Sequence, residues 1–454
     1  MPILYGRLLV KSKILTKTNK GDFMEKFVQK TFPHGVHFHD NKELSKEQAI
    51  EVMPLASDVF ISVSQHIGAP STPIVKAGDQ VVKGQLIADA VGGLGSKVYA
   101  SVCGEVVGIV KKVGAAGGMA DHIHIKTSEQ QDEVVSLPAL EVKDKASVLN
   151  RIFEAGIVGM GGAGFPTNVK LKPAKPVDTL IINGAECEPY ITCDYRLMLE
   201  KANEVIAGAK YLAMACGIDK VVFGIEANKM DCAELFASLG ADVVVLKKKY
   251  PQGAEKDLIV AVNGRRVPCG GLPMDVGVVV QNIATAYAAY EAVELGKPCY
   301  ERLMTVSGRA INSTKNIIVA NGTRYSDIIE YCGGLKDDVC KLISGGPMMG
   351  FAVVDTSIST TKTTGSLLAL TEKETNLDKP TNCINCGRCA KACPMSLMPM
   401  YMDFYTLAGD YDTAVKYGVM NCFECGSCAY VCPARRQIVQ SVRLCKKKLR
   451  ERKK

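Results

Sequence analysis

Two runs of four cysteines near the C-terminus constrain this chain more than any other feature. Each run follows the spacing C-x2-C-x2-C-x3-C and is followed directly by a proline. The first run is Cys383, Cys386, Cys389 and Cys393, and the second is Cys422, Cys425, Cys428 and Cys432. This is the bacterial spacing for cubane iron–sulfur clusters, in which three thiolates come from one tight loop. The runs therefore predict two 4Fe–4S clusters and the transfer of single electrons.

The alternative for these cysteines is structural zinc, which uses two ligand pairs rather than four cysteines at this spacing. In two-cluster ferredoxins the fourth cysteine of a run ligates the other cluster, so a crossover of Cys393 and Cys432 is a hypothesis that the spacing leaves open. Between the runs, residues 395–421 predict a helix, a turn at Gly409 and a second helix. This spacer resembles the α-helical ferredoxin fold, and we expect that domain over 371–445.

Length and composition indicate several ordinary domains. The 454 residues are too many for one core, and 47% hydrophobic with 22% charged residues is typical of soluble proteins. No apolar stretch approaches the ~20 residues of a membrane-spanning helix. The longest apolar segment, Val278 to Val293, is predicted to be a buried helix. Ten scattered cysteines in a chain of this size indicate free thiols and a reducing cytoplasm.

The two ends of the chain lack a clear motif. Residues 1–31 carry lysines within and after an apolar part and no cleavage site, so we expect an extension, with disorder or a mis-assigned start as alternatives, and no signal peptide. Residues 446–454 form a basic tail. An anionic membrane surface or an acidic protein suits that tail better than nucleic acid, for which no recognition motif is present, and a solvated tail is the simplest alternative. Arg435 and Arg436 are expected to be solvated.

Alternating short strands broken by glycines are predicted from Asp58 to about Lys126. Two stretches, 74–90 and 99–113, resemble the hairpins of a biotinyl/lipoyl-like flattened barrel without the lysine that a carrier presents at its tip. We expect a scaffolding barrel-sandwich domain over 32–135.

Apolar runs of buried-strand length then alternate with helical stretches, which predicts a βαβ sheet covered on both faces over 143–297. The predicted strands are 177–186, 219–226 and 241–248, and one helical stretch is 195–216. After this domain, residues 302–370 resemble a soluble-ligand-binding β-grasp (SLBB) domain. The expected fold class is therefore multidomain α/β.

A second constellation is the glycine-rich loop of 156–170, GIVGMGGAGFPTNVK. Its glycines let a ligand approach the backbone and expose successive N–H groups to anionic or electron-rich atoms. No strand leads directly into it, so it is not a dinucleotide fingerprint of the Rossmann type. The segment INGAECEPYITCDYR, which follows the strand near Leu180, supplies carboxylates that could accept hydrogen bonds from ribose hydroxyls.

Together these segments resemble the flavin-binding subunit of respiratory complex I. The resemblance implies noncovalent FMN and NADH held by Gly159, Gly161, Gly162, Gly164, Phe165, Lys170, Asn183, Glu186, Glu188 and Asn282. Lys170, Glu186 and Glu188 are the candidate catalytic residues, and Ala185 replaces an aspartate of that family. The alternatives are a helix-capping role for either glutamate and a surface role for Lys170.

The order of segments, from HGVHFHDNK through the glycine loop to the two cysteine runs, resembles the RnfC family of ion-translocating electron transport complexes. The resemblance implies a peripheral NADH dehydrogenase module on the cytoplasmic face of the membrane. It also implies membrane-embedded and ferredoxin-like Rnf partners, ferredoxin as an indirect partner, membrane association through partners, and coupling to Na+ or H+ transport.

Two alternatives remain open at this point. One is a soluble flavin and iron–sulfur reductase of related architecture, such as a cobalamin reductase or an electron donor to amino-acid reductases. The other is an electron relay without nucleotide chemistry.

Overall fold

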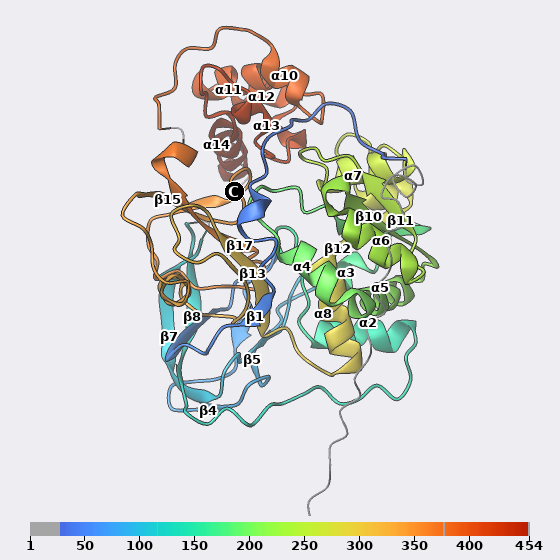
Figure 1. The fold of residues 1–454 in the computed structure, drawn as a ribbon, viewed down its shortest axis with the longest axis vertical. Helices are drawn as coiled ribbons and strands as arrows, with labels where there is room; N and C mark the ends of the chain where they lie inside the picture. The colour runs from blue at the N-terminus through green and yellow to red at the C-terminus, as the bar shows by residue number, and fades with distance from the viewer. Residues whose placement is uncertain (1–27, 116, 376, 453–454) are drawn as a thin grey trace, which may run out of the picture.

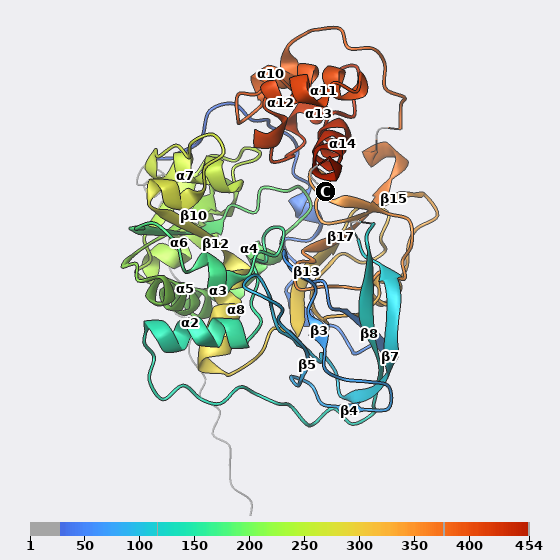
Figure 2. The same cartoon turned by 180° about the vertical axis from the view of Figure 1, so that it is seen from behind.

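The computed structural model describes residues 28–115, 117–375 and 377–452. Figures 1 and 2 show a helical domain that carries both cysteine runs at one end of the molecule. Below it, the nucleotide domain lies on one side and two β domains lie on the other. Most of the predicted extension 1–31 lies outside the described residues. In the part of the chain that is described, no helix is long and apolar enough to cross a membrane.

The nucleotide domain is a four-stranded parallel sheet in the order β11-β10-β9-β12. Its strands are β9 (Thr179–Gly184), β10 (Lys220–Glu226), β11 (Val243–Leu246) and β12 (Val278–Asn282). The three predicted strands are confirmed. The prediction that Val278–Val293 is one buried helix is wrong, because its first five residues form β12 and only Ile283–Glu294 forms helix α8. Both elements are buried, and an apolar run cannot distinguish a buried strand from a buried helix.

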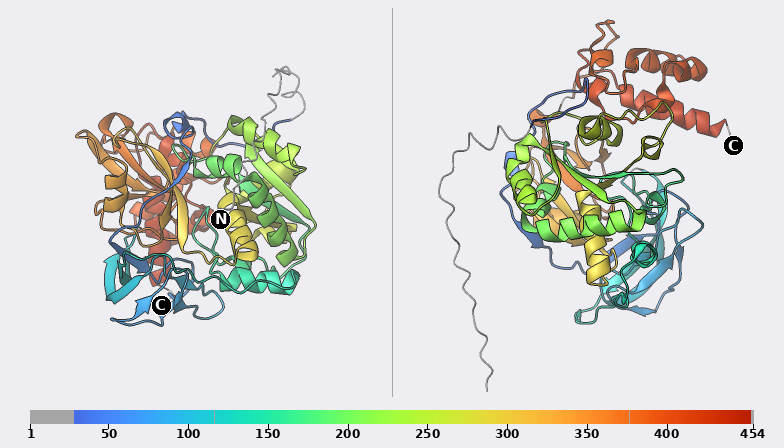
Figure 3. Two further views of the ribbon diagram at one scale, coloured as in Figure 1. Left: turned by 60° about the horizontal axis from the view of Figure 1, so that its bottom comes forward. Right: turned by 90° about the vertical axis from the view of Figure 1, so that its right-hand side faces the viewer.

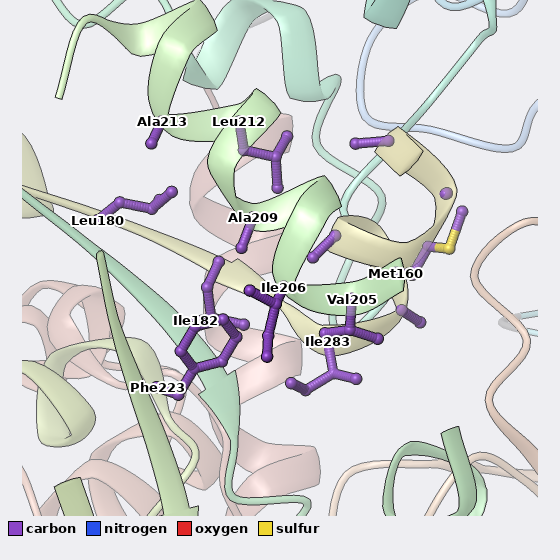
Figure 4. Packing of buried hydrophobic residues seen from close by; sticks show 14 of the residues in the cluster. Met160, Leu180, Ile182, Val205, Ile206, Ala209, Leu212, Ala213, Phe223 and Ile283 are labelled. Atoms are coloured by element: carbon purple, nitrogen blue, oxygen red, sulfur yellow. The ribbon is translucent and has the colours of Figure 1, made fainter. Parts of the chain in front are cut away.

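Helices cover both faces of this sheet, as predicted. The helices are α2 (Lys145–Glu154), α3 (Thr167–Lys170), α4 (Cys193–Glu200), α5 (Ala202–Cys216), α6 (Met230–Ser238), α7 (Glu255–Asn263) and α8. Along β9, Leu180 and Ile182 pack against α5 and α8, whereas Ile181 points to α7 on the other face. Figure 4 shows the first of these layers. A Cβ on Gly208 would lie 1.8 Å from the Ala286 carbonyl, so glycine is what allows α5 and α8 to cross this closely.

The barrel domain consists of two small sheets around one core. One sheet has the order β2-β8-β7-β4 and the other β3-β5-β6. The strands are β2 (Asp58–Ser62), β3 (Thr72–Pro73), β4 (Gln80–Val81), β5 (Leu86–Asp89), β6 (Val98–Tyr99), β7 (Gly104–Val113) and β8 (Met119–Thr127). Buried residues from both sheets, such as Ile61, Ile87 and Ile123, share one cluster. This arrangement agrees with the predicted barrel sandwich.

The β-grasp domain is a six-stranded sheet in the order β1-β14-β13-β17-β15-β16. Its strands are β13 (Glu301–Ser307), β14 (Lys315–Ala320), β15 (Val339–Ser344), β16 (Phe351–Val353) and β17 (Ser366–Thr371), with helix α9 (Tyr325–Tyr331) between β14 and β15. The sixth strand, β1 (Ile50–Val52), comes from the N-terminal part of the chain and pairs in parallel with β14.

Residues 30–52, here called the strap, cross three domains. Lys30 forms a parallel bridge with Leu246 at the edge of the nucleotide sheet, and Val36 exchanges two backbone hydrogen bonds of 2.8 and 2.9 Å with Tyr250. The strap then reaches the β-grasp sheet as β1. Its residues lie outside the barrel, although the sequence-based boundary at residue 32 assigned them to the barrel domain.

The cluster domain is helical, with α10 (Arg388–Ala392), α11 (Pro399–Leu407), α12 (Tyr411–Lys416), α13 (Ser427–Tyr430) and α14 (Ile438–Glu451). The predicted helix–turn–helix spacer corresponds to α11, Gly409 with φ +77°, and α12. The predicted basic tail begins inside α14, which projects along one side of the molecule in Figure 3. Lys446 is committed to the domain, because its ammonium donates to the Cys422 carbonyl at 2.6 Å.

Candidate flavin and iron–sulfur site

The glycine-rich loop leaves α2 and folds into a narrow hairpin. The Gly159 amide donates to the Phe165 carbonyl at 2.9 Å, and Val158 forms a bridge with Pro166. The Met160 amide donates to the Thr285 hydroxyl at 3.0 Å in the first turn of α8. As predicted, the element before this loop is a helix and not a strand. The hairpin therefore lies against the N-terminal end of α8.

The crest of the hairpin is open to solvent at Gly161, Gly162 and Ala163. A Cβ on Gly161 would lie 2.8 Å from the Asn282 amide nitrogen, whereas a Cβ on Gly162 would meet no atom within 4 Å. Open space over an exposed glycine backbone, beside the N-terminus of a 12-residue helix, suits the phosphate and ring of a flavin. The residues present therefore fit FMN.

Asn282 connects the glycine loop to the acidic segment. Its side-chain oxygen caps α8 by accepting from the Ala284 amide at 2.8 Å, and its side-chain NH2 donates to the Asp194 carboxylate at 2.7 Å. The Asp194 amide in turn donates to the Glu186 carboxylate at 2.7 Å. The structure thus brings Gly161, Asn282 and Glu186 together through Asp194.

Glu186 is buried behind the end of β9 with a left-handed backbone, φ +43°. One carboxylate oxygen accepts from the N-terminal backbone of α4, and the other lies 3.3 Å from the Lys42 ammonium. Burial raises the pKa of this carboxyl, and Lys42 and Lys229 oppose that rise. The helix-capping alternative for Glu186 is therefore realised, and a contact with ribose stays a prediction.

Glu188 points away from the glycine loop and into the β-grasp domain. Its two carboxylate oxygens accept from the Met348 and Met349 amides at 3.1 and 3.0 Å, and the Tyr250 hydroxyl lies 3.5 Å away. A Cβ on Gly346 would lie 2.1 Å from the Glu188 carboxylate, so only glycine leaves room for it. Burial raises the pKa of Glu188 to about 7, against the lowering effect of the two amides. This carboxyl is therefore partly protonated near neutral pH.

Lys170 and Asn183 flank the loop of residues 250–255 from two sides. The Lys170 ammonium pairs with Glu255 at 2.6 Å at the start of α7, and the Asn183 side-chain NH2 donates to the Gly253 carbonyl at 2.8 Å. Lys170 is half-buried, which argues against a purely solvated charge. Its contact with flavin stays a prediction.

The two cysteine runs fold in the same way. Left-handed residues occur at the same offsets after the first cysteine of each run, at Asn385, Gly387 and Ser396 and then at Glu424, Gly426 and Arg435. The short helices α10 and α13 follow Gly387 and Gly426. The repeat in sequence is therefore also a repeat in backbone conformation, as expected of two loops that each wrap one cluster.

The fourth cysteine of each run lies with the other run. Cys432 lines one cavity with Cys383, Cys386 and Cys389. Burial raises the pKa of the Cys428 thiol, and the nearby sulfurs of Cys422, Cys425 and Cys393 raise it further. The cysteines thus fall into two sets of four. We call Cys383, Cys386, Cys389 and Cys432 the outer set, and Cys393, Cys422, Cys425 and Cys428 the inner set.

The donor chemistry of both sets fits 4Fe–4S clusters, since each offers four thiols around one space. In the described ranges, no three His, Cys, Asp or Glu side chains converge as the ligands of a single metal ion would. Arg436 also lines the outer cavity, where it pairs with the buried Asp403 at 2.8 Å. The expectation that Arg436 is solvated is therefore wrong.

The inner set contacts the acidic segment. The Tyr250 hydroxyl donates to the Cys425 carbonyl at 2.6 Å, and Tyr250, Cys187, Met348 and Cys425 belong to one apolar cluster. A Cβ on Gly426 would lie 2.9 Å from the Met348 carbonyl. Cys383 and Cys386 of the outer set are exposed instead. The inner set is therefore joined to the flavin domain.

Fold and site together define an FMN-binding, two-cluster electron-transfer protein. Family models bear this out: the Nuo51 FMN-binding domain matches residues 152–291 and the 4Fe-4S dicluster domain matches 375–433. The RnfC barrel sandwich hybrid domain matches 30–130 and the SLBB domain matches 303–352. The predicted fold class and cofactors are thereby confirmed.

Curated relatives match almost end to end, and each is the RnfC-type component of its complex. The chain is 46% identical to that component of the proton-translocating ferredoxin:NAD(+) oxidoreductase complex of Clostridium ljungdahlii, covering 92% of this chain and 93% of that protein. Identity is 41% to its counterpart in the Na(+)-translocating ferredoxin:NAD(+) oxidoreductase complex of Acetobacterium woodii, over 92% and 97% of the two chains. For the ion-translocating oxidoreductase complex of Rhodobacter capsulatus, identity is 43% over 92% and 83%. The chain belongs to this RnfC family.

Sequence analysis missed several residues of the site. Lys42 and Tyr250 bind the acidic segment from distant parts of the chain, and Met348 and Met349 hold Glu188 from the β-grasp domain. Lys42 and Tyr250 lie in segments whose motifs, HGVHFHDNK and YPQGAEKD, the family resemblance already singled out. Those motifs marked the segments without showing where their side chains would lie.

Proposed function

We propose that this chain is the NAD(H)-reacting subunit of an Rnf-type membrane complex. It exchanges electrons with NADH at FMN and carries them singly through two 4Fe–4S clusters, linking NADH and ferredoxin to Na+ or H+ transport. A bound flavin supplies the step from a hydride pair to single electrons. The observation that carries the proposal is the 2.6 Å hydrogen bond from Tyr250 to Cys425, because it joins the acidic segment of the flavin domain to a cysteine loop.

Residues of the chain have distinct parts in this function. The backbone of Gly161 and Gly162, with the N-terminus of α8, would hold the flavin phosphate or ring. Lys170 would supply positive charge beside an anionic reduced ring. Glu188 and Asn183 lie at the strand end where the nicotinamide nucleotide would bind. These roles rest on the open crest of the glycine loop and on the position of the strand end beside it.

The path of electrons in the chain follows from the two cysteine sets. Tyr250 and Met348 connect the acidic segment to the inner set, so that set would exchange electrons with the flavin. Cys383 and Cys386 of the outer set are exposed, so that set would face the electron partner. That partner would be another Rnf subunit, membrane-embedded or ferredoxin-like, with ferredoxin itself acting indirectly.

We infer a peripheral position on the cytoplasmic face, with membrane attachment through partner subunits. To test this, the tagged chain is isolated anaerobically from inverted membrane vesicles. We expect membrane subunits to co-purify, and an alkaline wash to release this chain without detergent. Isolation with a corrinoid protein or a selenoprotein reductase, and without membrane subunits, would instead assign the chain to a soluble reductase system.

A further inference from the structure

A buried lysine of the strap holds the acidic segment in place. Lys42 is 7% exposed, and its ammonium donates to the Glu186 carboxylate at 3.3 Å and to the Glu188 carbonyl at 3.1 Å. It also donates to the Ile191 carbonyl. An ammonium has three hydrogens, and these three acceptors use all of them. A buried charge is tolerated only when it is paired and hydrogen-bonded in this way.

The three acceptors lie at both ends of one turn, residues 186–191. Two residues of this turn have left-handed backbones, Glu186 with φ +43° and Tyr190 with φ +68°. Such conformations are uncommon for residues other than glycine and persist only where the surroundings impose them. The lysine, which reaches in from a segment about 150 residues earlier in the sequence, is one such constraint.

Other contacts of the strap support the same turn. The Tyr190 amide donates to the Asp40 carbonyl at 2.7 Å, and the Ser45 hydroxyl is hydrogen-bonded to that of Thr192 at 2.8 Å. On the far side, the Lys229 ammonium donates to the Ala185 carbonyl at 2.7 Å. The turn is thus held between two buried lysines, and Lys42 connects its two ends.

We propose that Lys42 is a positioning residue for the nicotinamide nucleotide: it sets the shape of the turn 186–191 without touching the flavin or the substrate. This inference rests on the proposed function, in which the acidic segment binds NAD(H). Loss of the ammonium should loosen the turn and weaken nucleotide binding. FMN binding should persist, because the partners of Lys42 lie in the turn and not in the glycine loop or α8.

The test is Lys42→Met, which keeps the length of the side chain and removes the charge, in protein loaded with FMN and both clusters. We expect the KM for NADH in ferricyanide reduction to rise on the order of tenfold, with kcat changed less than about twofold and FMN content unchanged. The control is Lys46→Met, because Lys46 lies in the same segment, is exposed, and pairs with the exposed Glu47 at 3.5 Å. An unchanged KM in Lys42→Met would overturn the proposal.

A second variant covers the case in which Lys42→Met does not fold. The double variant Lys42→Met/Glu186→Gln removes both charges of the buried pair and is compared with Glu186→Gln alone. A KM higher in the double variant than in Glu186→Gln supports the proposal, because the carbonyls of Glu188 and Ile191 have lost their donor. Equal KM values contradict it. If the wild-type protein itself fails to react with NADH, the proposed function fails and not the role of Lys42.

Discussion

Cys432→Ala will destroy the cluster of the first cysteine run, although Cys432 belongs to the second run. The reason is that Cys432 shares a cavity with Cys383, Cys386 and Cys389. Cys393→Ala will correspondingly destroy the cluster held by the second run. In each variant we expect about half of the roughly eight iron atoms to be lost or labile, because a cubane needs four thiolate ligands.

EPR of the reduced variants identifies which cluster remains. Cys432→Ala should give the same residual signal as Cys386→Ala, and Cys393→Ala the same as Cys425→Ala. The exposed Cys340, which lies in the β-grasp domain, is the matched control, and Cys340→Ala should retain both signals. If Cys432→Ala matches Cys425→Ala instead, each run holds its own cluster and the two sets of four are wrong.

Gly162→Val will abolish retention of FMN while the protein stays folded. A Cβ at this position meets no atom of the chain within 4 Å, so the substitution is tolerated by the protein itself. If the open space over the crest is occupied by the flavin, the branched side chain collides with it. We expect FMN affinity to fall on the order of a hundredfold, as measured by fluorescence titration of the flavin-free protein.

Two comparisons make the Gly162 result decisive. Gly93→Val, at an exposed position of the barrel domain with equally open surroundings, should bind FMN as the wild type does. The thermal unfolding temperature of the flavin-free Gly162→Val protein should equal that of the wild type. Normal FMN affinity in Gly162→Val would place the flavin elsewhere.

The sequence predicted those features that are written in local patterns. The cysteine spacing, the glycine-rich loop and three of the nucleotide-domain strands each depend on neighbouring residues, and all have the expected place in the structure. Val278–Val293 shows the limit of such patterns. A run buried on all sides has no alternation, so β12 and α8 were merged into one helix.

Contacts between distant segments were not predictable from local patterns. A lysine at position 42 would ordinarily be exposed, and only the fold shows that it is buried against Glu186. The pairing of β1 with β14 and the contact of Tyr250 with Cys425 likewise join residues far apart in the chain. These contacts explain why Glu188 lies at a junction of three domains rather than at the rim of an isolated nucleotide site.

Reaction of the reconstituted protein with NADH tests the central claim most directly. The chain is loaded anaerobically with FMN and both clusters, and NADH is added while flavin absorbance and EPR are recorded. The account predicts bleaching of the flavin followed by the EPR signals of reduced 4Fe–4S clusters. If FMN and both clusters are present and NADH changes neither signal, the chain does not take electrons from NADH and the account is contradicted.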